Sequence, residues 1–179
     1  MNQTVILVDD RDKFLGYAPK EDCHAGNGKK HRAFVALLFD SQNRVLIQRR
    51  KHKLFDNLWD FTAVSHTLHL GDKDEDYQLA SDRTLFKEVG VGGAPIKKIG
   101  GFNYFAKDGK NCENEYCAIL VGRYDGEYQP NYNEVYGIKK VDFYQFIRHV
   151  LDNPQEFTPW AVPAVRELKK LNISKFLDF

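Results

Sequence analysis

The triplet Glu113-Asn114-Glu115 combines residue types and a spacing that suit chemistry. Side chains alternate along a strand, so Glu113 and Glu115 point to the same face of any strand that contains both. Two carboxylates placed in this way repel each other unless a cation or a proton lies between them. A solvated strand face also carries such pairs, so the triplet alone leaves both interpretations open.

Histidines elsewhere in the chain extend this set. His24 and His31 lie seven residues apart in a polar segment that contains glycine, and His66 lies seven residues after Trp59. A single histidine is more often a surface or packing residue. Together with two carboxylates, however, three imidazoles suit a borderline divalent ion such as Mn²⁺, Zn²⁺ or Mg²⁺. The predicted metal site therefore has five ligand residues: His24, His31, His66, Glu113 and Glu115.

The elements that must position these residues alternate between strands and helices. Hydrophobic patterning predicts strands over residues 4–8, 14–18, 33–39, 45–48, 96–105, 113–124 and 135–141, with a loop and a short strand over 58–65. Helices are predicted over 75–89, with an acidic approach over 71–76, and over 142–151 and 163–171. A turn at Asp108-Gly109 is predicted to join the strands 96–105 and 113–124. We expect the first helix to end at Gly90 and to bury Leu79, Phe86 and Val89, and the second to be capped by Asp142.

Length and composition limit the class of protein. A chain of 179 residues predicts one domain, 1–179, of the α/β or α+β class. The 26 basic and 25 acidic residues give a net charge of +1, which provides no broad surface for nucleic acid. The longest apolar run, 33–39, is too short for a membrane span, and no basic leader opens the chain, so we expect a cytoplasmic protein. The three cysteines contain no Cys-x-x-Cys pair, which argues against a disulfide scaffold.

The segment before Val91 partly matches a known phosphate-chemistry motif, the Nudix box. The matching residues are Glu75, Arg83, Leu85, Glu88, Gly90 and Val91. Thr84 and Lys87 stand where the box has glutamates, and His69 stands where it has its first glycine. In the box those glutamates hold the magnesium ions that drive pyrophosphate hydrolysis. The sequence therefore fits a conventional Nudix hydrolase poorly.

A longer ordered series of residues extends over nearly the whole chain. It comprises Val5-Ile6-Leu7-Val8-Asp9, Lys20 with His24, His31-Arg32-Ala33-Phe34, Gln48-Arg49-Arg50, Leu58-Trp59 followed by Ser65-His66, Tyr104, Glu113-Asn114-Glu115 and Thr158-Pro159-Trp160. This series, with the box reduced to Arg83 and the Glu88-Val89-Gly90 end, resembles the type 1 isopentenyl-diphosphate isomerases of the Nudix superfamily. The resemblance implies a Nudix fold with a mixed β-sheet sandwiched between helices.

The same resemblance implies a role for each site residue. The five ligand residues would bind one divalent metal, and Glu88 would help to bind a second ion, Mg²⁺, on the substrate diphosphate. Lys20, Arg50 and Lys53 would contact that diphosphate. Tyr104 and Glu115 would supply a proton, and the face of Trp160 would stabilise a carbocation. The implied partner is a small-molecule diphosphate, isopentenyl or dimethylallyl diphosphate, with no nucleic acid and no membrane, and we expect a monomer.

The chain departs from the family where the catalytic cysteine is expected. That position lies five residues after Trp59 and two before His66, and here it is Val64. Valine neither donates nor accepts a proton, so the usual acid/base partner is missing. Two alternatives to a weakened isomerase stay open: a divergent Nudix hydrolase of a nucleotide or prenyl diphosphate, and a catalytically silent protein that binds a prenyl diphosphate.

Overall fold

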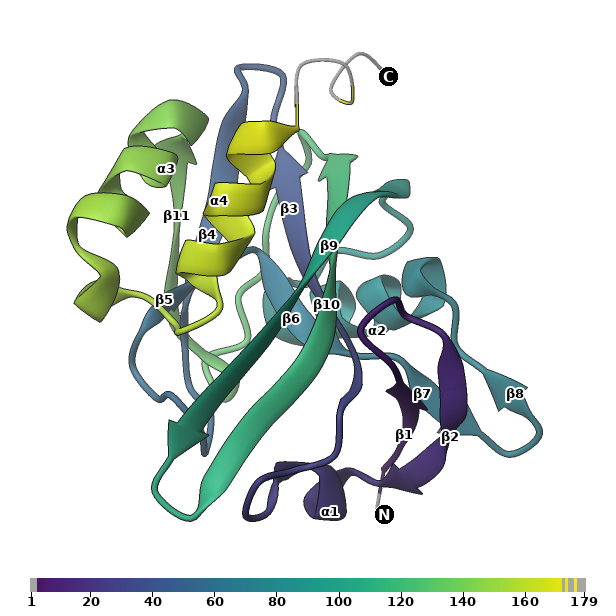
Figure 1. Ribbon diagram of the computed structural model, residues 1–179. Helices are drawn as coiled ribbons and strands as arrows, with labels where there is room; N and C mark the ends of the chain where they lie inside the picture. The colour runs from purple at the N-terminus through teal and green to yellow at the C-terminus, as the bar shows by residue number, and fades with distance from the viewer. Residues whose placement is uncertain (1–2, 172, 174–175, 177–179) are drawn as a thin grey trace.

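A mixed β-sheet forms the centre of the molecule (Figure 1). The computed structural model describes residues 3–171, 173 and 176. Its strands are β1 (Thr4–Val8), β2 (Phe14–Pro19), β3 (His31–Phe39), β4 (Arg44–Arg50), β5 (Trp59–Asp60), β6 (Ala63–His66), β7 (Leu68–Leu70), β8 (Lys73–Asp74), β9 (Ile96–Asp108), β10 (Asn111–Arg123) and β11 (Val135–Asp142).

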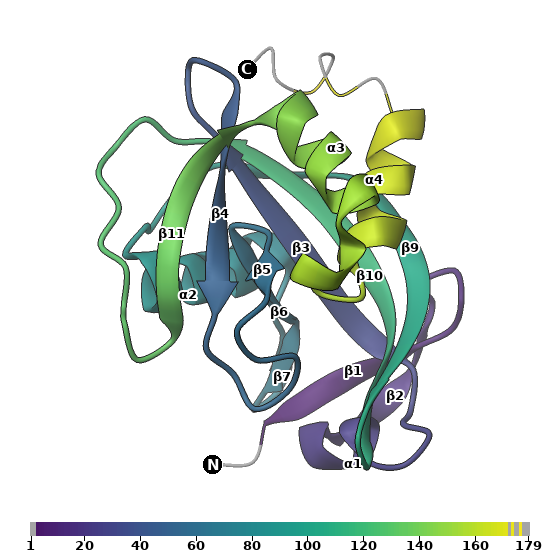
Figure 2. The same cartoon turned by 90° about the vertical axis from the view of Figure 1, so that its left-hand side faces the viewer.

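Helices cover both faces of this sheet. They are α1 (Lys20–His24), α2 (Tyr77–Val89), α3 (Phe143–Asp152) and α4 (Ala161–Lys170), with a 3₁₀ turn η1 (Pro154–Glu156) before α4. Figure 2 shows α3 and α4 on one face of the sheet and α2 behind the other. The predicted α+β class, with a mixed sheet sandwiched between helices, is therefore confirmed.

Strand β3 lies at the middle of this sandwich. Val35 and Leu37 belong to the core that α3 and α4 cover, whereas Phe34 and Ala36 belong to the core beneath α2. A strand buried on both faces needs apolar side chains at successive positions, and this is why its sequence shows no alternation. β3 pairs in parallel with β10 and antiparallel with β1, β4 and β6.

Helix α2 has well-defined ends. It begins at Tyr77, because the Asp76 side chain caps it by accepting a hydrogen bond from the Leu79 backbone N–H at 2.8 Å. Its predicted start at residue 75 was therefore too early. The predicted end is confirmed, since Gly90 adopts a left-handed conformation with φ of 72° and its N–H contacts the last-turn carbonyls.

The buried face of α2 differs from the prediction. Leu79 and Phe86 are 58% and 70% exposed, so only Val89 of the three expected apolar residues is buried. Small and polar side chains lie beside Leu85 and Val89 on the buried face of the helix: Ala80, Ser81, Thr84 and Glu88. Small residues let a helix lie close to a strand, and here that geometry brings Glu88 inward.

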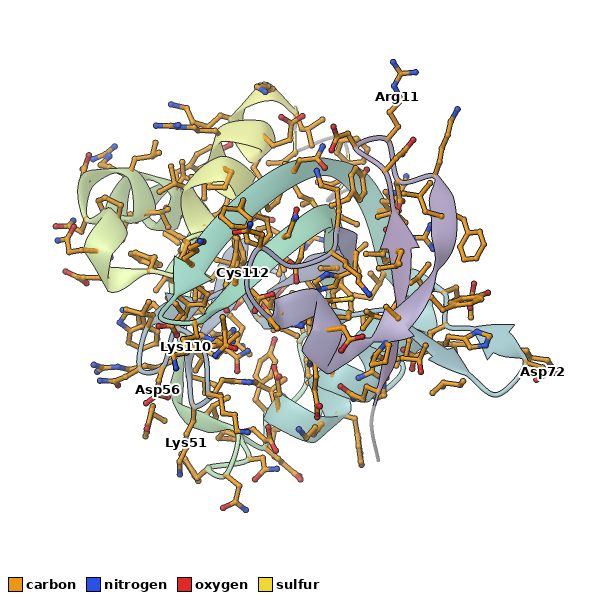
Figure 3. The ribbon with its side chains drawn as sticks, turned by 60° about the horizontal axis from the view of Figure 1, so that its bottom comes forward. Arg11, Lys51, Asp56, Asp72, Lys110 and Cys112 are labelled. Carbon is orange, nitrogen blue, oxygen red and sulfur yellow. The ribbon has the colours of Figure 1, made fainter. Side chains whose placement is uncertain are left out.

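Two short elements were not predicted. Residues 20–24, expected as part of a polar loop, form α1 directly after Pro19. Strands β7 and β8 form a hairpin around Gly71, whose φ is 66°, where an acidic approach to α2 was expected. Figure 3 shows Asp72 at the tip of this hairpin, away from Lys110 at the tip of the β9–β10 hairpin. Elements of two to five residues are too short to give a periodic pattern.

The β9–β10 hairpin and the α3 cap follow the sequence prediction. The turn between β9 and β10 contains Asp108 and Gly109, and the φ of Gly109 is 59°. Asp142 caps α3 by accepting a hydrogen bond from the Gln145 N–H at 2.9 Å. Within the part of the chain that the structure describes, no helix has the length and apolar character needed to cross a membrane.

Candidate active site

The strand register brings four of the predicted site residues to one face of the sheet: His31, His66, Tyr104 and Glu115. Glu115 of β10 lies opposite His31 of β3 on one side and opposite Tyr104 of β9 on the other. His66 of β6 pairs with Ala33, two residues after His31, so it points to the same face. Residues that are far apart in the sequence therefore meet through backbone pairing.

Five buried side chains form a cluster that could hold a metal ion. One potential ligand atom from each lies within 4.8 Å of all the others, and the residues are His24, His31, His66, Glu113 and Glu115. His24 comes from the end of α1, and Glu113 lies two residues before Glu115 on β10. The structure thus brings together all five residues of the predicted metal site.

Hydrogen bonds to the backbone orient two of these imidazoles. Nδ1 of His24 donates to the Lys20 carbonyl at 2.7 Å, and Nδ1 of His31 donates to the Lys29 carbonyl at 2.8 Å. A carbonyl oxygen only accepts, so Nδ1 carries the proton and Nε2 keeps a free lone pair. Metal-bound histidines are oriented in the same way in many proteins.

Unpaired polar atoms mark the centre of the cluster. Among the described residues, Nε2 of His24, Nε2 of His31 and Oε2 of Glu113 are buried without a hydrogen-bond partner. Nε2 of His24 lies 2.9 Å from Oε2 of Glu113, but not in hydrogen-bond geometry. Leaving three such atoms unsatisfied is costly, and a cation at the centre would satisfy them all. The donor set of nitrogen and carboxylate oxygen fits a borderline divalent ion.

Glu115 is the most connected ligand residue. Its Oε1 lies 2.7 Å from Nε2 of His66 and 3.3 Å from Nε2 of His31, and its Oε2 accepts a short hydrogen bond from the Tyr104 hydroxyl. Burial pushes the pKa of Glu115 up, but His31 and Tyr104 outweigh this effect, so the pKa lies below its usual value. Glu115 is therefore a carboxylate at neutral pH.

Tyr104 is held in its protonated form. Burial is the largest influence on the pKa of Tyr104, and the neighbouring charge of Glu115 adds to it, so this pKa lies well above its usual value. Burial and the nearby charge of Lys20 lower the pKa of His66 well below its usual value. The cluster thus presents a phenol O–H, a carboxylate and a neutral imidazole side by side.

The cluster opens into a cavity of about 690 Å³. Every residue predicted for the site except the fully buried His31 lines this cavity. Positive side chains also line it: Lys20, Arg50, Lys53, Arg83 and Lys87. Burial lowers the pKa of Lys20, although Glu113 and Glu115 oppose this effect. The cavity therefore combines a metal-ligand cluster with a basic region suited to a phosphate-bearing ligand.

Arg50 and Trp160 lie together in the wall of the cavity. Cζ of Arg50 is 4.9 Å from the centroid of the Trp160 ring, and Nη1 of Arg50 donates to Oδ2 of the buried Asp60 at 2.7 Å. Lys53, in contrast, is exposed at the rim. The Arg50 guanidinium is thus already paired with an anion, which a free diphosphate-binding arginine would not be.

Glu88 lies at the other side of the cavity. Its Oε2 accepts a hydrogen bond from Nε2 of Gln48 at 2.8 Å, and its Oε1 is 3.7 Å from Nε2 of His52. Burial raises the pKa of Glu88 to about 7, and burial with the charge of Arg50 lowers the pKa of His52 to about 4. A buried carboxyl with this pKa titrates near neutral pH.

Three residues of this region were not recognised in the sequence. Asp60 stands between Trp59 and Phe61, and a charged residue between aromatics was a signal that it is buried. Gln48 and His52 lie on either side of the basic run 49–51, where they resemble solvated residues. Gln48 is buried and bonded to Glu88 of α2, and His52 is half-buried beside it, which no local pattern shows.

Val64 faces the cavity. It pairs with Val35 of β3, packs against the core that contains Trp160, and lines the cavity with Glu115 and Tyr104. Ser65 pairs with Phe34, which belongs to the core beneath α2, so Ser65 belongs to the opposite face of the sheet, although it also lines the cavity. The side chain at position 64 is thus directed toward the space that a ligand would occupy.

Cys117 does not replace the missing thiol. It shares the strand face of Glu115, but it is fully buried in the core and does not line the cavity. Burial raises the pKa of the Cys117 thiol well above its usual value. A thiol in this setting is an inert packing group.

Comparisons with known proteins agree with the fold and the site. Residues 29–168 match the family model described as the NUDIX domain. A Deinococcus radiodurans protein of known structure superposes with a TM-score of 0.69 at 18% identity, covering 92% of this chain and 98% of that one. The MutT protein from Methanosarcina mazei gives a TM-score of 0.61 at 13% identity, with 79% and 94% covered. At these identities the structures share the fold alone.

Sequence relatives are more specific. The isopentenyl-diphosphate Delta-isomerase of Serratia proteamaculans is 31% identical over 94% of this chain and 92% of its own length. The enzyme of the same name from Schizosaccharomyces pombe is 33% identical over 89% of this chain and 79% of its own length. The chain therefore belongs to the Nudix superfamily and, within it, to the isopentenyl-diphosphate Delta-isomerase family of isomerase-like enzymes.

We predict that the cluster binds a divalent metal tightly enough to stabilise the fold. Chelator-treated protein should gain about 3 kcal/mol of unfolding free energy with Mn²⁺ or Zn²⁺ at about 100 times the dissociation constant. His31→Ala should abolish this gain, since it removes a ligand nitrogen. His149→Ala is the matched control, because His149 pairs with Glu156 at the surface. Equal metal content in parent and His31→Ala would contradict the prediction.

We predict that Glu88 lowers the stability of the metal-free protein as the pH rises. Its folded-state pKa of about 7 lies above the ordinary 4.5, so the folded state favours the protonated form and loses stability between these pH values. Glu88→Gln should therefore stabilise the protein by up to about 3 kcal/mol more at pH 8 than at pH 4.

Urea unfolding in EDTA at both pH values measures this difference. Glu167→Gln, which removes a surface carboxylate paired with Lys170, serves as the control and should show no such dependence. A constant difference between parent and Glu88→Gln across the pH range would show that Glu88 is not the titrating group.

Proposed function

We propose that the chain interconverts isopentenyl diphosphate and dimethylallyl diphosphate, moving the double bond by adding a proton at one end of the allyl unit and removing one at the other. The observation that carries this proposal is the buried cluster of three histidines and two glutamates, with the Tyr104 hydroxyl on Glu115, beside a cavity with a basic region. The relatives' name supports the same substrate pair.

Two cation sites take part in this proposal. The five-residue cluster would hold one divalent ion, whose positive charge would keep the Glu115 carboxylate in place. Glu88, whose Oε2 accepts from Gln48, would help to hold a Mg²⁺ ion bound with the diphosphate. Lys20, Arg50 and Lys53 supply the positive charge that attracts the diphosphate.

The proton for the double bond comes from the Tyr104 and Glu115 pair. Tyr104 keeps its proton and shares it with Oε2 of Glu115 in a short hydrogen bond, so the pair places a transferable hydrogen beside the cavity. Proton addition leaves a positive carbon, and the neighbouring Trp160 ring stabilises it through its π face.

The second proton transfer is the weak step. Val64 occupies the position where the family has a cysteine, and it faces the cavity without a group that accepts or donates a proton. We therefore propose that binding is complete in this chain and that turnover is slow.

Hydrolysis is the second candidate activity, and the cavity favours it less. Of the α2 residues that line the cavity, Arg83, Thr84 and Lys87 carry no carboxylate, which leaves Glu88 alone. The Thr84 hydroxyl donates to the Ala80 carbonyl at 2.9 Å, so it is occupied within the helix. Diphosphate hydrolysis in this fold relies on several carboxylates to hold its metal ions.

We predict isomerisation of isopentenyl diphosphate in D₂O with Mg²⁺ and Mn²⁺, seen by NMR as deuterated dimethylallyl diphosphate. Glu115→Gln should reduce the rate by roughly 10²–10⁴-fold, because it removes the carboxylate that accepts from Tyr104. Glu167→Gln, at the surface, should keep the parental rate.

Three results would count against this activity. Absence of both product and deuterium uptake would leave a silent binding protein, phosphate release would indicate a hydrolase, and undiminished turnover by Glu115→Gln would show that protons take another route.

We predict that Val64→Cys raises the isomerisation rate by roughly 10²–10⁴-fold, because a thiol at this position provides the missing proton-transfer group. Val64→Ala is the matched control, since it enlarges the cavity without a thiol. Steady-state rates for the parent and both variants measure the effect. Equal rates for the Cys and Ala variants would mean that more than this one residue limits turnover.

A further inference from the structure

Asp60 connects two residues of the cavity wall without lining the cavity itself. Its side chain is fully buried, and Oδ2 accepts a hydrogen bond from Nη1 of Arg50 at 2.7 Å. Oδ1 accepts from Nε1 of Trp160 at 2.8 Å. Arg50 and Trp160 both line the cavity, whereas Asp60 lies behind them. Any influence of Asp60 on a bound ligand must therefore pass through these two side chains.

Further donors complete the environment of this carboxyl group. Oδ1 also accepts from the Phe61 backbone N–H at 2.9 Å and from the Thr158 hydroxyl at 3.1 Å. Within the described part of the chain, these four donors surround Asp60 and no acceptor is bonded to it. Burial raises the pKa of Asp60, and the Arg50 guanidinium and the Trp160 N–H oppose this effect. A carboxyl proton would have no acceptor among these four donors, so the hydrogen-bond pattern favours the ionised carboxylate.

The position of Arg50 creates an electrostatic problem for the proposed chemistry. Its Cζ lies 4.9 Å from the Trp160 ring centroid, so one resident cation already interacts with the ring that is to stabilise a carbocation. An uncompensated guanidinium there would occupy the negative face of the ring by cation–π attraction, and it would repel a second positive charge. The Asp60 carboxylate, 2.7 Å from the guanidinium, cancels most of that charge.

We propose that Asp60 is a positioning residue that makes Trp160 usable for carbocation stabilisation. It fixes the edge of the indole through Nε1 and neutralises Arg50 against the ring face. The same pairing limits what Arg50 contributes to diphosphate binding: Nη1 is held by Asp60, while the buried Nε has no partner among the described residues. This inference rests on the proposed isomerisation.

The proposal predicts opposite effects on two kinetic constants. Asp60→Asn can keep its oxygen toward Trp160 and Thr158 while its amide group faces Arg50, so the packing is retained and the charge is lost. Arg50 is then released toward the diphosphate, so KM should stay constant or fall. The carbocation meets an unneutralised guanidinium, so kcat should fall by about tenfold. A residue that only supports the fold would raise KM as kcat falls.

A double variant tests the compensation directly. In Arg50→Met with Asp60→Asn both charges are gone, so kcat should recover toward that of the parent while KM rises. Asp40→Asn is the matched control, since Asp40 is also a buried aspartate paired with an arginine, Arg44, but Arg44, unlike Arg50, does not line the cavity. The double variant also decides the case if Asp60→Asn alone does not fold.

A binding measurement separates this inference from the proposed function. In a Trp59→Phe background Trp160 is the remaining tryptophan of the sequence, so its fluorescence reports on the environment that Asp60 provides. Asp60→Asn should shift this emission and should bind inorganic pyrophosphate with Mg²⁺ at least as tightly as its parent does.

The outcomes are distinct. If the parent converts isopentenyl diphosphate, the inference is overturned when Asp60→Asn leaves kcat unchanged, when KM rises with the loss of kcat, or when the double variant recovers nothing. If the parent converts no isopentenyl diphosphate, the proposed function fails. The Trp160 fluorescence and pyrophosphate-binding measurements then test the positioning role of Asp60 by themselves. Unchanged Trp160 emission or weaker pyrophosphate binding in Asp60→Asn then overturns the positioning role.

Discussion

The parallel pairing of β3 with β10 is the constraint on which the rest of the site depends. It places His31 opposite Glu115, and the neighbouring strands then add Tyr104 and His66 to the same face. A shift of one residue would turn Glu115 toward α2 and separate it from the histidines. Because β3 is buried on both faces, each alternative register would expose or misplace apolar side chains in two cores at once. The hydrophobic packing of β3 thus secures the geometry of a polar site.

Local patterns in the sequence were enough for the long elements and insufficient for the short ones. A few residues of sequence are enough to predict the apolar strand β3 and the turn at Gly109 between β9 and β10. Helix α1 and the β7–β8 hairpin cannot be predicted in this way, because elements of two to five residues are too short to show a periodic pattern. The face of α2 was misjudged because Leu79 and Phe86 are apolar yet exposed, whereas Ala80 and Thr84 lie beside Leu85 on the buried face.

The site shows the same division between what is local and what is not. The spacing in Glu113-Asn114-Glu115 was enough to place two carboxylates on one strand face. The hydrogen bond between Asp60 and Trp160 joins residues that are 100 positions apart. It depends on the path of the chain through η1 into α4, so no spacing in the sequence predicts it. That partnership also changes how Arg50 is understood, since its guanidinium is held between an anion and a ring. The charge in this cavity therefore depends on pairs of residues. A count of basic side chains overstates the positive charge that is free to attract a diphosphate.

Val64 can be exchanged without disturbing this architecture. Its backbone pairs with Val35 whatever its side chain is, and it contributes no atom to the histidine and glutamate cluster. Metal ligation, the Tyr104 hydrogen bond to Glu115 and the Asp60 network each depend on other residues. In the proposed mechanism, binding and charge stabilisation therefore depend on the fold, whereas proton transfer on the Val64 side depends on a single side chain. Under this proposal, ligand binding and the rate of turnover can change independently of each other.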